Sequence, residues 1–294
     1  MKKAEIFRGV STALITPFKD EGIDYGSLEK LIERQIVAGI DALVIGGTTA
    51  EAATLSDVER YELFKASKDM IGGRCKLILG TGTNDTRVAV KHTEFASLLG
   101  CDGVLVVTPY YNKGTQAGVV KHYERIAEAS DVPVLLYNVP SRTGVNLSIE
   151  TLMRLRENER IVGIKEASDS LDRFMAISTI EGLALYSGND SQIYPVLALG
   201  GLGVISVVSN IYPRETIEIC KQYFSNNRDN SLLLQQRLLP IINTLFLEIN
   251  PSPIKYALFK KGLCSSEMRL PMYPPSEETS RKIDEAIRTF EGEA

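Results

Sequence analysis

The stretch Ile161-Val162-Gly163-Ile164-Lys165-Glu166-Ala167-Ser168 is the most informative part of the sequence for predicting the fold and the site. An extended segment with apolar residues on both faces is typical of a strand buried in a parallel sheet. Alternation of side chains puts Lys165 on the same face as Ile161 and Gly163. Burial favours the neutral amine, which is a nucleophile that forms a Schiff base with a carbonyl substrate. The alternative is a lysine that extends from the strand end into solvent.

The composition narrows the class of protein. The chain has 294 residues, of which 44% are hydrophobic, a length that fits a barrel with an extension. A net charge of −4 with mixed signs argues against nucleic acid as a partner. The N-terminus lacks the apolar core of a signal peptide, and no apolar run has the ~18–20 residues of a membrane span. We therefore expect a cytoplasmic protein that does not bind membranes.

The cysteines and histidines point away from metal chemistry. The cysteines are scattered and form no CxxC pair, so we expect reduced thiols. His92 and His122 fall in amphipathic helical stretches without partners of metal-ligand spacing, which favours surface or helix-packing roles.

Apolar strand-like runs alternate with helical patterns along most of the chain, which is typical of consecutive βα units. Strands are expected at 9–17, 41–47, 76–82, 103–109, 132–139, around Lys165, 183–188 and 203–209. Helices are expected at 25–38, from Ser56, after Asn84 or Asp85, and at 116–130, 148–157, 171–179, 192–199 and 213–225. Ser56 and Glu59 form a capping box at the start of the second helix.

Eight βα units within about 225 residues predict an α/β fold of the (β/α)8 TIM-barrel type. The alternative is a doubly wound sheet, which usually has a glycine-rich first turn that this chain lacks. We expect a catalytic barrel over 1–225 and a C-terminal helical domain over 226–294. The second part contains helical patterns at 232–247, 253–261 and 277–290.

In a barrel, reactive groups lie at the carboxyl ends of the strands. The predicted strand ends carry Thr48 and Thr49, Tyr111, Tyr137, Arg142, and Lys165. Threonine hydroxyls and backbone N–H groups suit a carboxylate, a tyrosine can shuttle protons, and an arginine can hold a second carboxylate with its fork. No metal-ligand spacing or phosphate loop is present, so we expect the lysine to work without a cofactor.

Each of these residues also has a structural interpretation. The threonines could cap the next helix, Tyr137 could be core, and Arg142 could be a surface loop residue. The occurrence of all of them at neighbouring strand ends favours carbon–carbon bond formation through a Schiff base.

The sequence resembles the dihydrodipicolinate synthase family, within the superfamily of pyruvate-dependent class I aldolases and N-acetylneuraminate lyases. The resemblance covers nearly the whole chain and rests on these segments: Gly47-Thr48-Thr49, Val107-Thr108-Pro109-Tyr110-Tyr111-Asn112, Tyr137-Asn138-Val139-Pro140-Ser141-Arg142-Thr143-Gly144, Gly163-Ile164-Lys165-Glu166-Ala167, Gly203-Val204-Ile205-Ser206-Val207, Asn250-Pro251-Ser252-Pro253-Ile254-Lys255 and Leu270-Pro271-Met272.

The resemblance implies a lyase that condenses pyruvate with L-aspartate 4-semialdehyde, in the diaminopimelate pathway to lysine. It implies that Lys165 forms the imine with pyruvate and that Tyr137, Thr48 and Tyr111 form a proton relay, with Tyr111 supplied by a neighbouring subunit. Family members are usually homotetramers built from two tight dimers, and a homodimer is the other expectation.

The resemblance also assigns the substrate contacts. Thr49 would hold the carboxylate of pyruvate, Arg142 that of the semialdehyde, and Gly188 and Ile205 would line the pocket through their backbones. The alternatives are a sister aldolase, of the sialate lyase or 2-keto-3-deoxy sugar acid type, and a catalytically silent barrel. Arg142 argues against the first, and the intact set around Lys165 against the second.

The chain departs from the family pattern at two places. Ala50 stands where the family typically has glycine, which would strain the loop if that position needed a positive φ. Lysine-sensitive members carry histidines and a glutamate where this chain has Asp57, Arg60 and Val88. We therefore expect weak or absent inhibition by lysine.

Overall fold

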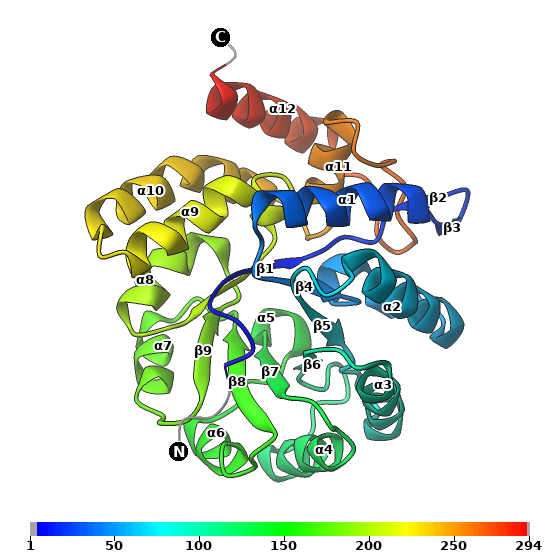
Figure 1. The fold of residues 1–294 in the computed structure, drawn as a ribbon, viewed down its shortest axis with the longest axis vertical. Coiled ribbons are helices and arrows are strands. Elements are labelled where there is room, and N and C mark those ends of the chain that lie inside the picture. The colour runs from blue at the N-terminus through cyan, green and yellow to red at the C-terminus, as the bar shows by residue number, and fades with distance from the viewer. Residues whose placement is uncertain (1–4, 293–294) are drawn as a thin grey trace.

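The centre of the computed structural model, which describes residues 5–292, is a closed barrel of parallel strands (Figure 1). The strands follow one another around the barrel as β1 (Gly9–Ala13), β4 (Ala42–Ile45), β5 (Lys76–Gly80), β6 (Gly103–Val107), β7 (Val134–Asn138), β8 (Ile161–Glu166), β9 (Ala184–Ser187) and β10 (Gly203–Ser206), which pairs again with β1. The predicted TIM barrel is confirmed, with strands somewhat shorter than the apolar runs suggested.

Helices follow the strands and surround the barrel (Figure 1). They are α1 (Tyr25–Ala38), α2 (Asp57–Ile71), α3 (Thr86–Leu99), α4 (Gln116–Glu128), α6 (Ile149–Leu155), α7 (Leu171–Ser178), α8 (Ile193–Ala198) and α9 (Pro213–Phe224). The capping box predicted for Ser56 and Glu59 is present at the start of α2. Because each cap satisfies backbone N–H groups that a helix start leaves unpaired, such residues mark helix boundaries in the sequence.

Several short elements decorate the ends of the strands. They are the hairpin β2 (Phe18–Lys19) and β3 (Gly22–Ile23), the one-turn helices η1 (Thr48–Ala50), η2 (Ala52–Thr54), η3 (Asp190–Gln192) and η4 (Val208–Asn210), and α5 (Pro140–Thr143). The sequence did not predict α5, which is only one turn long and carries Arg142.

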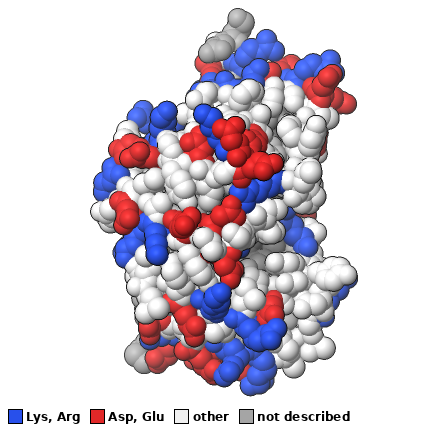
Figure 2. All heavy atoms as spheres, turned by 90° about the vertical axis from the view of Figure 1, so that its right-hand side faces the viewer, with Lys and Arg blue, Asp and Glu red and all other residues white. Residues whose placement is uncertain are grey.

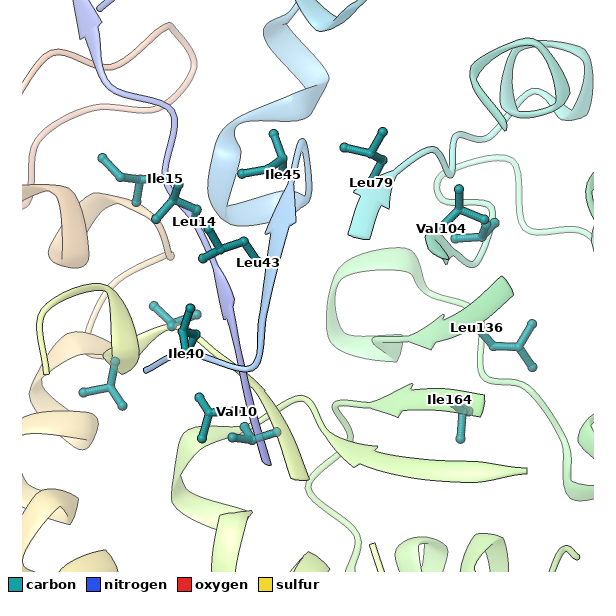
Figure 3. Close-up of a cluster of buried hydrophobic side chains, with 14 of the residues drawn as sticks. Val10, Leu14, Ile15, Ile40, Leu43, Ile45, Leu79, Val104, Leu136 and Ile164 are labelled. Carbon is teal, nitrogen blue, oxygen red and sulfur yellow. The ribbon is translucent and has the colours of Figure 1, made fainter. Parts of the chain in front are cut away.

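The strands separate two apolar layers. Leu43 and Ile45 of β4 belong to the layer between the barrel and its helices, part of which is drawn in Figure 3. Ala42 and Val44 of the same strand belong to the layer inside the barrel. This alternation explains why the strands are apolar at successive positions, since both of their faces are buried.

The expectation that Ile161 and Lys165 share one face of strand β8 was wrong. Ile161 packs in the outer layer and Val162 in the inner one, so Ile161 does not share a face with Lys165. The reason is an irregularity in the pairing with β7, where the register shifts between Val134 and Leu135. An extra residue in a strand reverses the side-chain alternation before it, and this cannot be read from periodicity alone.

The chain ends in three further helices, α10 (Arg228–Leu245), α11 (Ser252–Lys260) and α12 (Glu277–Glu291). Helix α10 lies beside α9, and α12 packs on both α10 and α11 (Figure 1). The expected division of the chain at 225/226 falls in the turn between α9 and α10. Helix α10 begins four residues before the helical pattern that we noted, at Arg228.

The surface carries charges of both signs, which are intermixed on the face shown in Figure 2. His92 and His122 are buried between helices, which agrees with a packing role. The cysteines at 75, 101, 220 and 264 form no disulfide. Across residues 5–292, no helix has the length and apolarity that crossing a membrane would require.

Candidate active site

A cavity of about 700 Å³ opens at the carboxyl ends of the strands and brings together most of the predicted site. Its walls include Thr48, Thr49, Tyr137, Arg142, Lys165 and Gly188. These residues come from the loops after β4 and β9, from α5, and from strands β7 and β8. Closure of the barrel therefore gathers side chains that are far apart in the sequence.

Lys165 and Tyr137 form the floor of this cavity. They are direct partners in the register of β8 and β7, so their side chains leave the sheet side by side. The Nζ atom of Lys165 lies 4.3 Å from the centre of the Tyr137 ring. Lys165 is only 5% exposed, and no carboxylate in the described part of the chain forms an ion pair with it. The amine is thus held against the phenol ring of Tyr137, an arrangement suited to attack on a small carbonyl compound.

Thr48 and Thr49 begin the turn η1 on one wall. Thr49 is buried, and its Oγ1 accepts a hydrogen bond from Asn250 Nδ2 at 2.9 Å. Ala50 lies within the turn and does not have a positive φ; the left-handed residue is the next one, Glu51, with φ 53°. Alanine therefore requires no strained backbone at position 50.

Arg142 and Gly188 stand on other walls. The guanidinium of Arg142 donates from Nη2 to the backbone carbonyl of Asn250 at 2.9 Å. Gly188 packs so tightly that an added Cβ would lie 2.6 Å from the Cβ of Ala167, so only glycine fits there. Because glycine has no side chain, the backbone of residue 188 itself forms part of the cavity wall.

Two predicted residues do not line the cavity. Ile205 is wholly buried in the inner apolar layer, and the wall next to it is formed by Val207. Tyr111 is 89% exposed on the loop after β6, with φ 72°. Within one chain, Tyr111 therefore takes no part in the cavity.

A polar network behind the site was not predicted. Asn138 and Glu166 directly follow Tyr137 and Lys165, so alternation points them to the other side of the sheet. Asn138 Nδ2 donates to both oxygens of the Glu166 carboxylate, at 2.9 and 3.0 Å, and Arg173 Nε donates to Glu166 at 2.9 Å. The signal was present in the sequence: a polar residue after each functional one, in strands otherwise buried on both faces.

A second cavity, of about 520 Å³, lies between the Thr48 loop, α2 and α3. Arg60 is buried in its wall and donates to the backbone carbonyls of Ala52 and Gly80, at 2.6 and 3.3 Å. Asp57 is engaged by Lys91 and His92, whose hydrogen bonds lower its pKa to about 2. Val88 completes this wall with an apolar side chain.

Neither cavity offers a metal centre among residues 5–292, where no three His, Cys, Asp or Glu side chains are grouped so that they could hold an ion.

Comparison with known proteins connects this site to a family. The model of the dihydrodipicolinate synthetase family matches residues 6–290. The 4-hydroxy-tetrahydrodipicolinate synthase of Clostridium novyi is 42% identical over 287 residues, which cover 97% of each chain. The crystal structure of dihydrodipicolinate synthase from Thermotoga maritima has a TM-score of 0.96 at 40% identity, covering 98% of this chain and 99% of that one. A lysine-bound structure of the Cyanidioschyzon merolae enzyme has a TM-score of 0.94 at 37% identity, covering 99% and 100%. With a match over nearly its full length and a lysine at the floor of a barrel-end cavity, the chain belongs to the dihydrodipicolinate synthetase family.

Proposed function

We propose that this chain catalyses the 4-hydroxy-tetrahydrodipicolinate synthase reaction, the condensation of pyruvate with L-aspartate 4-semialdehyde on the diaminopimelate route to lysine. The observation that carries the proposal is the placement of Lys165 against Tyr137 in a cavity that also presents Thr48, Thr49 and Arg142. The family relationship supplies the substrates. The condensation is a lyase-class reaction.

In the first half-reaction, the amine of Lys165 adds to the keto carbon of pyruvate and water leaves, which forms an imine. Thr49 holds the pyruvyl carboxylate through its hydroxyl and the backbone N–H groups of η1. Tyr137 delivers the proton to the departing hydroxyl, because its own hydroxyl can both donate and accept. Thr48 connects Tyr137 to the rest of the proton relay.

In the second half-reaction, loss of a proton from the pyruvyl methyl group gives an enamine. The enamine carbon attacks the aldehyde carbon of the semialdehyde, whose oxygen takes up a proton and becomes the hydroxyl of the product. Arg142 holds the semialdehyde carboxylate. The amino group of the semialdehyde then attacks the imine carbon, the ring closes, and Lys165 leaves as the free amine. Covalent attachment to Lys165 takes the place of a cofactor.

Backbone groups complete the pocket in this proposal. Gly188 contributes its backbone to the wall beside the imine, and beyond Ile205 the end of β10 leads to Val207, which reaches the cavity.

We further propose that the active unit is an oligomer, a homotetramer or a homodimer, in which Tyr111 enters the neighbouring subunit's site. An aromatic side chain that is 89% exposed, on a loop with left-handed backbone, is typical of an interface residue. A cytoplasmic location is proposed from the four unpaired cysteines.

The test is reduction of the imine. Incubation with pyruvate and borohydride is expected to leave a reduced pyruvyl adduct on Lys165, located by peptide mass mapping, and Lys165→Met is expected to remain unlabelled. Lys260→Met, which removes an exposed lysine outside the cavity, is the control, and it should leave labelling at Lys165 unchanged. An adduct on another lysine, or none, would exclude the Schiff-base mechanism for this chain.

A further inference from the structure

A buried ion pair links the C-terminal segment to the loop that carries the two threonines. Lys255 of α11 donates to Glu51 Oε1 at 2.5 Å, and the two side chains are 0% and 1% exposed. The other carboxylate oxygen of Glu51 accepts from the backbone N–H of Arg269 at 3.0 Å. Lys255 also donates to the carbonyl of Glu267 at 2.9 Å, and its Nζ lies 4.3 Å from the centre of the Phe18 ring. Both charges are therefore fully partnered out of contact with water.

Stability alone is a weak reason for such a pair. Removing two charges from water costs about as much as their attraction returns, so apolar residues of similar size often stabilise a fold equally well. The pair instead fixes the positions of the two side chains, because a charge-assisted hydrogen bond between buried groups permits little movement. The position of Glu51 in the chain shows which part of the site the pair holds in place.

Glu51 belongs to the loop after β4 that carries Thr48 and Thr49. It directly follows η1, which contains Thr48 and Thr49, and its backbone N–H bonds to the carbonyl of Thr48 at 3.1 Å. Its φ of 53° lies in the left-handed region, which is uncommon for a residue with a side chain, and its side chain is buried. The ion pair between its carboxylate and Lys255 holds the Glu51 side chain in place.

The same C-terminal segment holds the loop at a second point. Asn250 lies five positions before Lys255 in the chain and donates to Thr49 Oγ1 at 2.9 Å. The loop is thus fixed at Thr49 and at Glu51 by a stretch of only six residues, 250–255, from outside the barrel strands.

We propose that Glu51 and Lys255 are positioning residues for the condensation: their buried pair sets the turn in which Thr48 and Thr49 meet pyruvate. This inference rests on the proposed function. Neither residue touches the substrate, and their effect passes through the threonines. The pair should therefore govern mainly the pyruvate half of the reaction, because Arg142 contacts the 250–255 stretch only through the backbone carbonyl of Asn250 and makes no contact with Glu51 or Lys255.

The main experiment separates positioning from stability. The double variant Glu51→Gln/Lys255→Met removes both charges together and retains an acceptor for the N–H of Arg269. We expect it to fold with a thermal midpoint close to that of the wild type, yet to lose about 10- to 100-fold in kcat/KM for pyruvate, since misplacing a contact group by about 1 Å costs up to that much. The KM for the semialdehyde should change by no more than about twofold.

Two further variants complete the test. Glu51→Asp keeps the charge but shortens the side chain, so it should fold and show a smaller loss confined to pyruvate. Lys260→Met is the matched control, because it breaks an ion pair with Asp284, of 3.1 Å, at the exposed side of the same helix. Its kinetic constants should equal those of the wild type.

The outcomes separate the two levels of the proposal. If the wild type gives no adduct with pyruvate and borohydride, the proposed function itself fails. If the wild type is active and the folded double variant and Glu51→Asp both use pyruvate as well as it does, the pair is structural only and the positioning role is refuted. Equal losses for pyruvate and the semialdehyde would also refute it, because they would show a general disturbance of the site.

Discussion

Replacing Arg142 by alanine should separate the two substrates. The guanidinium of Arg142 lies on the cavity wall, with one hydrogen bond, to the carbonyl of Asn250. No carboxylate of the described chain pairs with it, so its charge is free to meet an anionic substrate. Arg142→Ala removes that charge and the planar fork together.

The size of the effect follows from the exposure of the residue. A hydrogen bond to a charged group contributes about 1.5–3 kcal/mol, which corresponds to about a 10- to 150-fold loss in kcat/KM for the semialdehyde. Because Arg142 lies at the exposed mouth of the cavity, solvent screening places the expected loss near the tenfold end. The kcat/KM for pyruvate should change by no more than about twofold, since in the proposed function it is Thr49, and not Arg142, that holds pyruvate.

A coupled assay measures this, with each substrate varied while the other is saturating. Arg142→Lys retains the charge without the fork, so it should fall between the wild type and alanine. Arg154→Ala, which breaks an ion pair with Glu124 of 3.5 Å outside the cavity, is the matched control and should have wild-type constants. Equal losses for both substrates, or no loss, would mean that Arg142 does not hold the semialdehyde.

Three more predictions concern other parts of the molecule. Burial lowers the pKa of His122 to about 4, so between about pH 6.5 and 4 the unfolded chain binds a proton that the folded chain does not bind. This group alone should lower the free energy of unfolding by about 2 kcal/mol from pH 7 to 5. Denaturant titrations of His122→Gln should lack that part of the decline, while the part due to buried His92, whose pKa burial also lowers, should remain. Tyr111→Phe and Tyr137→Phe, each nearly inactive, should regain activity when co-expressed as mixed oligomers, and a mixture as inactive as its parents would place Tyr111 in its own subunit. Lysine should inhibit weakly or not at all, because buried Arg60 repels its ammonium groups and Val88 offers no acceptor; strong inhibition at submillimolar lysine would show a site built from other residues.

Much of the fold and part of the site followed from local pattern. Apolar runs buried on both faces predicted the strands, and the caps at Ser56 and Glu59 predicted a helix start, because both depend on neighbours in the chain. Since parallel strands in a barrel point the same way, the residues at their carboxyl ends had to meet at one rim. That is why the sequence alone could bring Lys165 and Tyr137 into one cavity.

The tertiary structure decided what depends on distant partners. The register shift opposite Ile161 lies between two strands and leaves no trace in the periodicity of either. Glu51 and Lys255 are 204 positions apart, and each alone is an unremarkable charged residue that would usually be solvated. Only when the C-terminal helices pack beside the closed barrel are both charges removed from water, and only then must each find the other, because a buried charge without a partner would be too costly to keep.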